Sequence, residues 1–439
     1  QEQIGFNGRL FLTAAVRADD SSAFGDNFER QYYPKVSGTW TVSEESFWDF
    51  DFVNSMRVRS AWGQAGRQPN AFARTPQFDV AVGPGGSPAI RLDTPGNPDV
   101  GPETSVEWEG GVDIAVLDDR VFGEFTYFKQ WVTDALVPQA LAPSNPFTGN
   151  ISSNLGSMEN WGWEAALDIT IIEGDNFGFN MRFSGDHTAN IITKLDDSIL
   201  EDSNFKEGWY YPNVVSHTMD SAKFSDPSDF TSAVDAWCDF GDPLSIEGLS
   251  VGGPSVPCAV EAANDQQLMW AAAFPAFTWS IAPTFRFLQN QLEVYSLIEG
   301  QYGRWLANID VDQQSSTGGT RYNARQSWLR NQATFIGARS IADDERWTGR
   351  YSADFWKVRE IGARYQVPQS VVGSLGVDRA SIAFSASNMI TIWRRQWRDR
   401  AGVRLPDVES VSQFSGEPNF SLQNAPSYAA YSFVLRVSF

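Results

Sequence analysis

The last nine residues, Tyr431-Ser-Phe-Val-Leu-Arg-Val-Ser-Phe439, alternate between large apolar side chains and smaller or polar ones. Successive side chains of an extended strand point to opposite faces. One face of this segment therefore carries Tyr431, Phe433, Leu435, Val437 and Phe439. The opposite face carries Ser432, Val434, Arg436 and Ser438. The stretch predicts a β-strand with one apolar face and one mostly polar face.

The same period-2 pattern recurs along the chain, most clearly at 106–116, 161–171 and 380–387. Alternation of this kind over four to eight residues or more indicates a strand rather than a helix. A coarse reading predicts an all-β chain of roughly twelve strands. These strands are expected near 6–18, 30–42, 55–65, 104–117, 120–133, 157–172, 177–190, 271–287, 291–304, 351–366, 378–390 and 427–439.

The connections between these strands choose between two architectures. A soluble β-sandwich also alternates, with its polar face in water. Here, however, short turns at 117–120, 173–176 and 288–291 alternate with long stretches near 66–103, 134–156, 191–270, 305–350 and 391–426. Short turns at one end and long loops at the other are typical of antiparallel transmembrane β-barrels. The sequence therefore favours a portion of such a barrel over a sandwich.

Composition supports this choice and excludes other classes. The 439 residues include 54 acidic and 33 basic ones, a net charge of -21, which argues against a nucleic-acid-binding protein. Two cysteines are too few for a disulfide scaffold or a four-cysteine zinc module. Aromatic residues reach 14%, with 17 Trp and 31 Phe, as expected if aromatic girdles line two membrane interfaces.

Six motifs resemble, in the right order, those of SusC/RagA-type TonB-dependent outer-membrane receptors. They include the strand-and-turn Tyr33–Phe47 and the run Gly96-Asn-Pro-Asp-Val-Gly-Pro-Glu-Thr104 before a strand. A third is the M-x-N-x-G-x-E pattern within Asn154–Glu164. The remaining three motifs lie at 56–66, 353–365 and 385–391.

The resemblance implies an integral protein of the bacterial outer membrane, with short periplasmic turns and long extracellular loops. It implies uptake of an oligosaccharide or a peptide, a SusD-like lipoprotein partner, and TonB acting through a plug. Residues 1–439 correspond to the C-terminal part of such a barrel, and we expect the N-terminal plug to lie outside them. An alternative is a plugless structural or interaction barrel of a surface assembly. A secreted sandwich that binds polysaccharide is a third hypothesis.

Cys238 and Cys258 both fall in the expected extracellular loop at about 191–270. In an oxidising compartment we expect them to form a disulfide, the alternative being two unpaired thiols. Acidic loop clusters such as Asp19-Asp20 could bind Ca²⁺, although solvated loop charges are the simpler interpretation. Histidines are too few for a specific catalytic arrangement, and we expect no enzyme, no cofactor and no resident metal site.

Loop aromatics are candidates for contact with ligand or partner, because exposed rings stack on sugars and anchor interfaces. They are Trp209, Tyr210, Tyr211, Trp305, Trp328 and Trp347. The final strand, with Tyr431, Phe433, Leu435, Val437 and Phe439, looks like the signal that outer-membrane assembly machinery reads. A plain last strand is compatible with that interpretation.

Overall fold

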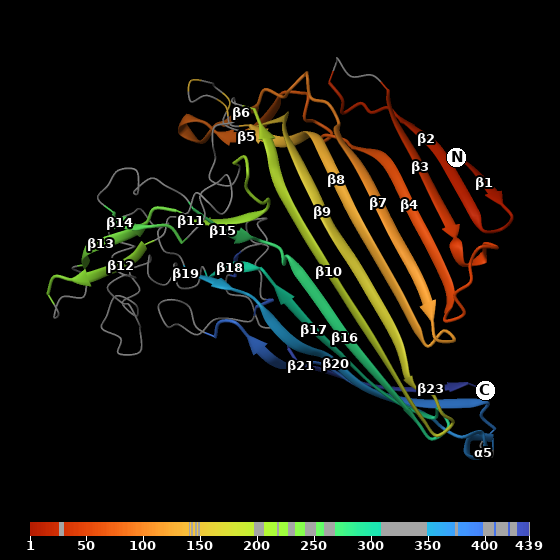
Figure 1. Cartoon of the computed structure of the whole chain (residues 1–439). Helices are drawn as coiled ribbons and strands as arrows, with labels where there is room; N and C mark the ends of the chain where they lie inside the picture. Colours follow the sequence, from red (N-terminus) through yellow and green to blue (C-terminus); the bar gives the residue numbers. More distant parts are fainter. Residues whose placement is uncertain are drawn as a thin grey trace. The chain divides into compact units, whose positions relative to one another are not determined.

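The computed structural model describes most of the chain as antiparallel β-sheet (Figure 1). Nothing is described for residues 26–29, 140, 142–143, 145–146, 148–149, 197–205, 217–218, 227–232, 242–251, 259–267, 309–348, 374–375, 398–407, 410–419, 422–427 and 439. No helix in the described part of the chain is long and apolar enough to cross a membrane.

The main sheet has thirteen strands in the order β1-β2-β3-β4-β7-β8-β9-β10-β16-β17-β20-β21-β23, so strands that follow one another in the main sheet are paired. Their bounds are β1 (Glu2–Phe6), β2 (Leu10–Asp19), β3 (Gln31–Thr41), β4 (Val53–Arg67), β7 (Glu103–Val116), β8 (Val121–Gln139), β9 (Ile151–Ile172), β10 (Phe177–Leu195), β16 (Phe277–Phe287), β17 (Leu292–Tyr302), β20 (Phe355–Gln366), β21 (Arg379–Arg394) and β23 (Ala430–Ser438). The prediction of an all-β chain with roughly twelve long strands is confirmed.

Smaller sheets lie in the connections of the main sheet. β5 (Gln77–Val82) pairs with β6 (Pro88–Thr94) between β4 and β7. Five short strands follow β10, and three more belong to the two later connections. They are β11 (Asn213–Ser216), β12 (Met219–Phe224), β13 (Ala233–Asp239), β14 (Ser255–Pro257), β15 (Leu268–Ala272), β18 (Trp305–Asn308), β19 (Gly349–Ser352) and β22 (Phe420–Ser421). Short helical turns are η1 (Val42–Glu44), η2 (Pro84–Gly86) and α5 (Gln369–Val372).

The chain divides into two compact units. The first comprises 1–114, 124–163 and 189–209, and the second comprises 115–123, 164–188 and 210–439. Long strands of the main sheet, such as β7 to β10, run side by side in Figure 1.

Predicted short turns are confirmed at one end of the strands, which we call the turn end. Leu117, Asp118 and Asp119 all have φ between 56° and 61°, and the Arg120 N–H donates to the Leu117 carbonyl at 3.2 Å. Leu288, Gln289 and Asn290 repeat this geometry with φ from 54° to 64°. Asp and Asn tolerate this left-handed conformation better than most residues, which explains their place in these hairpins. The other end, where the long connections lie, is the loop end.

Three sequence predictions about boundaries are wrong. The strand expected at 6–18 is two strands, because Asn7 and Gly8 adopt φ of 51° and 73° and form the β1–β2 hairpin turn. An Asn-Gly pair is a strong signal for such a turn. The long stretches at 66–103, 191–270 and 305–350 are not wholly irregular, because short strands pair within them. The stretch expected at 134–156 is shortened by the extension of β8 and β9.

Candidate functional site

The main sheet has an apolar face and a polar face, and β16 shows both. Trp279, Ile281 and Phe285 point to the apolar face, and alternate residues point to the polar face. Across the ladder, the rings of Phe179 and Phe285 stack with centroids 4.5 Å apart. On the opposite face the Ser184 and Ser280 hydroxyls are 2.7 Å apart. One face is therefore suited to lipid and the other to an aqueous interior.

Aromatic rings gather at both ends of the apolar face in the second unit. At the loop end, Trp356 lies 5.6 Å from Trp279 and 5.6 Å from Trp393, measured between ring centroids. Trp393 also lies 6.1 Å from Tyr302. At the turn end, Phe177 contacts Phe287 at 5.2 Å, next to the stacked pair described above. Two aromatic bands on one face are the pattern of a membrane barrel wall with two headgroup interfaces.

The polar face of the first unit holds a buried carboxylate between two arginines. Asp113 on β7 accepts from Arg57 at 2.7 Å and from Arg59 at 3.3 Å. Arg59 continues to the Thr126 hydroxyl on β8 at 2.7 Å. These contacts join three neighbouring strands by side chains as well as by backbone. The two guanidinium groups compensate the charge of the buried Asp113 carboxylate and tie the strands of the polar wall together.

A second charged network lies at the loop end of the second unit. Glu409, from the connection between β21 and β23, accepts from Lys357 at 2.5 Å and from Arg359 at 2.5 Å. Arg359 also donates to Glu299 on β17 at 2.8 Å. Lys357 is only 4% exposed, so its charge depends on Glu409. Burial raises the pKa of the Glu409 carboxyl, but hydrogen bonds from Arg359 and Lys357 outweigh burial and hold the pKa below its ordinary value.

The residue before Glu409 adds an apolar contact to the same attachment. Val408 is buried with Leu306, Tyr351, Ala353 and Phe355 in one cluster. The β21–β23 connection is thus fixed on β20 by ionic and apolar contacts together. This attachment is not predictable from local sequence, because Glu409 lies 52 residues from Lys357.

The predicted motif at 96–104 fixes a long connection onto neighbouring strands. Asn154 on β9 donates to the Gly101 carbonyl at 3.0 Å and accepts from the Gly101 N–H at 2.7 Å. The Asn97 side chain donates to the Ser152 carbonyl at 2.9 Å and accepts from the Asp99 N–H at 3.0 Å. Glu103 accepts from the Leu136 N–H at 3.1 Å. The motif is therefore a structural clamp between loop and wall.

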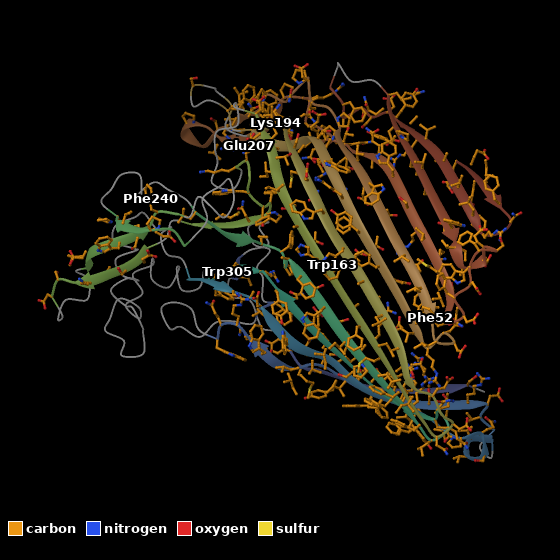
Figure 2. The ribbon with its side chains drawn as sticks, in the orientation of Figure 1. Phe52, Trp163, Lys194, Glu207, Phe240 and Trp305 are labelled. Atoms are coloured by element: carbon orange, nitrogen blue, oxygen red, sulfur yellow. A yellow bond between two sulfur atoms is a disulfide. The ribbon has the colours of Figure 1, made fainter. Side chains whose placement is uncertain are left out.

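Cys238 and Cys258 are joined by a disulfide in the structure, with an S–S distance of 1.98 Å. It connects β13 to the end of β14 within the small sheet β12-β13-β14. The adjacent Asp239 is buried, and its carboxylate accepts from the N–H groups of Gly241, Gly252 and Gly253 at 2.6 to 3.0 Å. These bonds close the loop around the disulfide. Phe240, labelled in Figure 2, follows Asp239 in the chain, and its N–H donates to the Pro254 carbonyl at 3.0 Å.

The candidate aromatic residues have different environments. Trp209 is 0% exposed, so it lacks the free ring face that ligand stacking requires. Its carbonyl accepts from the Ile192 N–H of β10 at 2.9 Å. Glu207, labelled in Figure 2 beside Lys194, attaches the same segment to β10 by accepting from the Leu195 N–H at 2.7 Å. Tyr210 and Trp305 are half-buried, and Tyr211 is exposed. The remaining two candidates, Trp328 and Trp347, lie outside the described residues.

The final strand is paired on one side only within the described chain. β23 pairs antiparallel with residues Arg379–Ser387 of β21, and Phe433 lies opposite Phe384. The side chains Tyr431, Phe433, Leu435 and Val437 are all exposed, and all lie on the apolar face. Phe439 lies outside the described residues. Its role as an assembly signal stays a prediction.

An exposed apolar surface on the β5–β6 hairpin was not predicted. Phe78, Val80, Val82 and Ile90 are 55%, 90%, 83% and 75% exposed. The register places Val80 opposite Ile90, so these side chains share one face of the hairpin. The opposite face carries the ion pair between Arg91 and Asp79 at 2.9 Å. The alternation of Phe78, Val80 and Val82 is the sequence signal for this strand, although the stretch at 66–103 is predicted above as an irregular connection.

The described residues hold no group of three or more His, Cys, Asp or Glu side chains arranged to bind a metal ion. The weak expectation of Ca²⁺ in the loops therefore stays a prediction without a located site. Asp19 of the proposed acidic cluster instead pairs with Arg17 at 2.6 Å.

Comparison with known proteins agrees with this architecture. Residues 1–251 match the family model described as TonB dependent receptor-like, beta-barrel. TonB-dependent receptor SusC of Bacteroides thetaiotaomicron is 28% identical over 204 residues, 43% of this chain and 20% of the relative. TonB-dependent receptor P3 of Formosa agariphila is 20% identical over 411 residues, 88% of this chain and 40% of the relative. The chain thus spans less than half the length of these relatives.

A solved structure of the RagAB peptide transporter shares the fold. It superposes with a TM-score of 0.74 at 16% identity, covering 100% of this chain and 46% of that one. A strand sheet with one lipid-suited face, two aromatic bands and long connections at one end defines the wall of an outer-membrane-type β-barrel.

The chain belongs to the TonB-dependent receptor β-barrel family. The predicted resemblance to SusC/RagA-type receptors is confirmed. Members of this family are transport receptors of the outer membrane, which supports the prediction that the chain is not an enzyme.

Proposed function

We propose that this chain forms wall and loops of an outer-membrane receptor that imports an oligosaccharide or a peptide with energy from TonB. The polar face lines the interior, and the apolar face contacts lipid. TonB acts through a plug inside the barrel. A SusD-like lipoprotein covers the loop end.

The separation of the two faces is the observation that carries this proposal. Paired charges such as Asp113 with Arg57 and Arg59 lie on one face, and aromatic bands lie on the other. In a soluble β-sandwich the outer face is in water, and exposed bands of Trp and Phe there would be unfavourable. The family match and the fold shared with a peptide transporter support the same direction.

The exposed apolar face of the β5–β6 hairpin is an observation in favour of a protein partner at the loop end. Exposed apolar surface of this kind on a folded protein marks an interaction site. Asp79 and Arg91 pair with each other on the opposite face of the hairpin, so their charges do not lie on the apolar face. A partner with an uncharged, apolar contact surface fits it best.

The uptake proposal is tested in cells that carry or lack the gene for the receptor. We expect outer-membrane fractionation of the protein and TonB-dependent uptake of labelled oligosaccharides or peptides that the deletion abolishes and complementation restores. A receptor found in the soluble fraction, or uptake unchanged in the deletion strain across both substrate classes, would contradict the proposal.

A further inference from the structure

A small cavity lies on the polar face where β17, β20, β21 and β23 run side by side. Strand register places three rows of side chains there. Tyr295 lies opposite Gly362, which lies opposite Ser385 and then Ser432. The other two rows are Arg364 with Ala383 and Val434, and Ser381 with Arg436. All of these residues belong to the second unit.

The cavity exists because small residues occupy the centre of these rows. Its volume is about 170 Å³, and Ser381, Ala383 and Ser385 of β21 form its floor. Gly362 lies beside the floor, beneath the Tyr295 ring: a Cβ there would lie 2.4 Å from the ring, so the glycine lets Tyr295 lie across β20 at the edge of the cavity. Longer side chains, Tyr295 and Arg364 on one side and Arg436 on the other, form the walls.

The polar groups around the cavity are mainly donors. Arg364 and Arg436 contribute two guanidinium groups, and three serines contribute hydroxyls. Arg364 has a single loose ion pair, 3.9 Å from Glu293. Within the described residues Arg436 has no ion pair. Two carboxylates border the cavity on its Tyr295 side, Glu293 beside Arg364 and Glu360, which accepts from the Tyr295 hydroxyl at 3.2 Å. The guanidinium available to a bound anion is therefore chiefly that of Arg436, next to the serine hydroxyls.

We propose that this cavity binds a carboxylate or phosphate group. Guanidinium groups match both anions in geometry and charge, and serine hydroxyls donate to the remaining oxygens. The volume suits one such group rather than a whole oligomer. If the polar face lines the import path as proposed above, the cavity is a subsite for an anionic group of the cargo. Anion binding itself does not depend on that proposal.

The test uses the full receptor purified in detergent, without TonB, and titrates it calorimetrically with acetate and separately with inorganic phosphate. We expect Arg364→Gln and Arg436→Gln each to weaken binding about tenfold, as loss of a charged hydrogen bond does. Ser385→Leu keeps both arginines and fills the floor, so it should abolish binding. Arg182→Gln is the matched control, since Arg182 has the same 55% side-chain exposure on the polar face but pairs with Asp168.

Binding of either anion that the three cavity variants reduce and the control preserves supports the proposal. The two titrations show whether the cavity prefers carboxylate or phosphate. The proposal is overturned if neither anion binds the folded wild-type receptor, or if Arg182→Gln weakens binding as much as Arg436→Gln. Because binding is measured without transport, a failed uptake assay and a failed titration have separate meanings.

Discussion

At the scale of single residues, this barrel wall depends on glycines placed under aromatic rings. A Cβ on Gly300 would lie 2.3 Å from the Trp279 indole nitrogen, and one on Gly66 would lie 1.8 Å from the Tyr33 hydroxyl. In both cases the ring of one strand covers the bare backbone of its neighbour. Only glycine leaves the space that this contact needs.

Gly300→Ala should therefore displace the Trp279 ring and lower the free energy of unfolding by about 1–3 kcal/mol, as overpacking does. Gly178→Ala is the control, because its Cβ would meet nothing closer than 3.5 Å. Urea unfolding of the receptor in detergent, followed by tryptophan fluorescence, measures both. Equal effects of the two substitutions would contradict this explanation.

The buried contacts of Glu409 give a second prediction at this scale. Glu409→Gln leaves Lys357 buried without its anion, so local stability of the 408–409 attachment should fall by about 1–3 kcal/mol. Hydrogen exchange of the Val408 and Glu409 amides measures this loss. Glu293→Gln is the control, since Glu293 makes only the 3.9 Å contact with Arg364.

The same attachment should depend on pH. Because the pKa of Glu409 is held below its ordinary value, the stability contributed by its charged form is present above that ordinary pKa. It is lost as the pH falls through the lowered pKa. The groups facing Glu409 are Lys357, Arg359 and Arg304, all cationic. Protection factors, which are exchange rates corrected for the intrinsic pH dependence of amide exchange, should fall on acidification, and constant protection factors would exclude this role.

At the scale of elements, the connections at the loop end carry their own small sheets. The disulfide holds β13 and β14 together where only three residue pairs form the ladder. A two-strand contact this short is marginal by itself. The disulfide and the three glycine N–H groups that donate to Asp239 hold the described parts of this loop, 238–241 and 252–258, together.

Replacing Cys238 and Cys258 with serine should loosen this loop and leave the main sheet intact. The two cysteines are 20 residues apart, so the chain-entropy model predicts a loss of about 3 kcal/mol for the local structure. Limited proteolysis within 233–258 measures it, with Ser255→Ala as the control. Unfolding of the whole receptor in the double variant would show that the loop supports the wall.

The β5–β6 hairpin gives the second prediction at the scale of elements. Val80→Asp with Ile90→Asp should abolish co-purification of the lipoprotein partner, because charge would enter an apolar contact. Ala81→Asp, on the opposite face of the same strand, is the matched control and should leave co-purification unchanged. Retention of the partner by the double variant would exclude the hairpin as its docking surface.

At the scale of the whole molecule, we propose that one face of the main sheet contacts lipid and the other contacts water. Ile281 and Ala282 are neighbours near the middle of β16 and point to opposite faces. Ile281→Lys should sharply reduce the folded receptor in outer membranes, since a cation facing lipid at mid-depth costs about 2–4 kcal/mol. Ala282→Lys should assemble normally. Heat-modifiable electrophoresis of outer-membrane fractions measures both, and equal assembly would contradict a lipid-facing role.

Some of the candidate site could be predicted from sequence and some could not. The clamp motif Asn97-Pro-Asp-Val-Gly101 was recognised as a unit, because its Asx turn is encoded locally. The cavity between Arg364 and Arg436 could not be predicted, because these residues are 72 positions apart and the pattern of each strand does not give its register with the next strand. The burial of Trp209 was also missed, because a loop tryptophan looks the same in sequence whether it is covered or free.

The long strands of the main sheet, their two faces, the turns at 117–120 and 288–291 and the family resemblance all follow from the sequence alone. Those features follow from backbone geometry with a period of two residues and from turn residues such as Asp118 and Asn290. Three other features depend on tertiary contacts: which side chains meet across strands, where Glu409 attaches, and the cavity over Ala383. These features depend on the path by which the long connections return to the sheet, and on the register of four strands. A local pattern does not contain either quantity, because contacts between distant residues are set by the packing of the whole sheet.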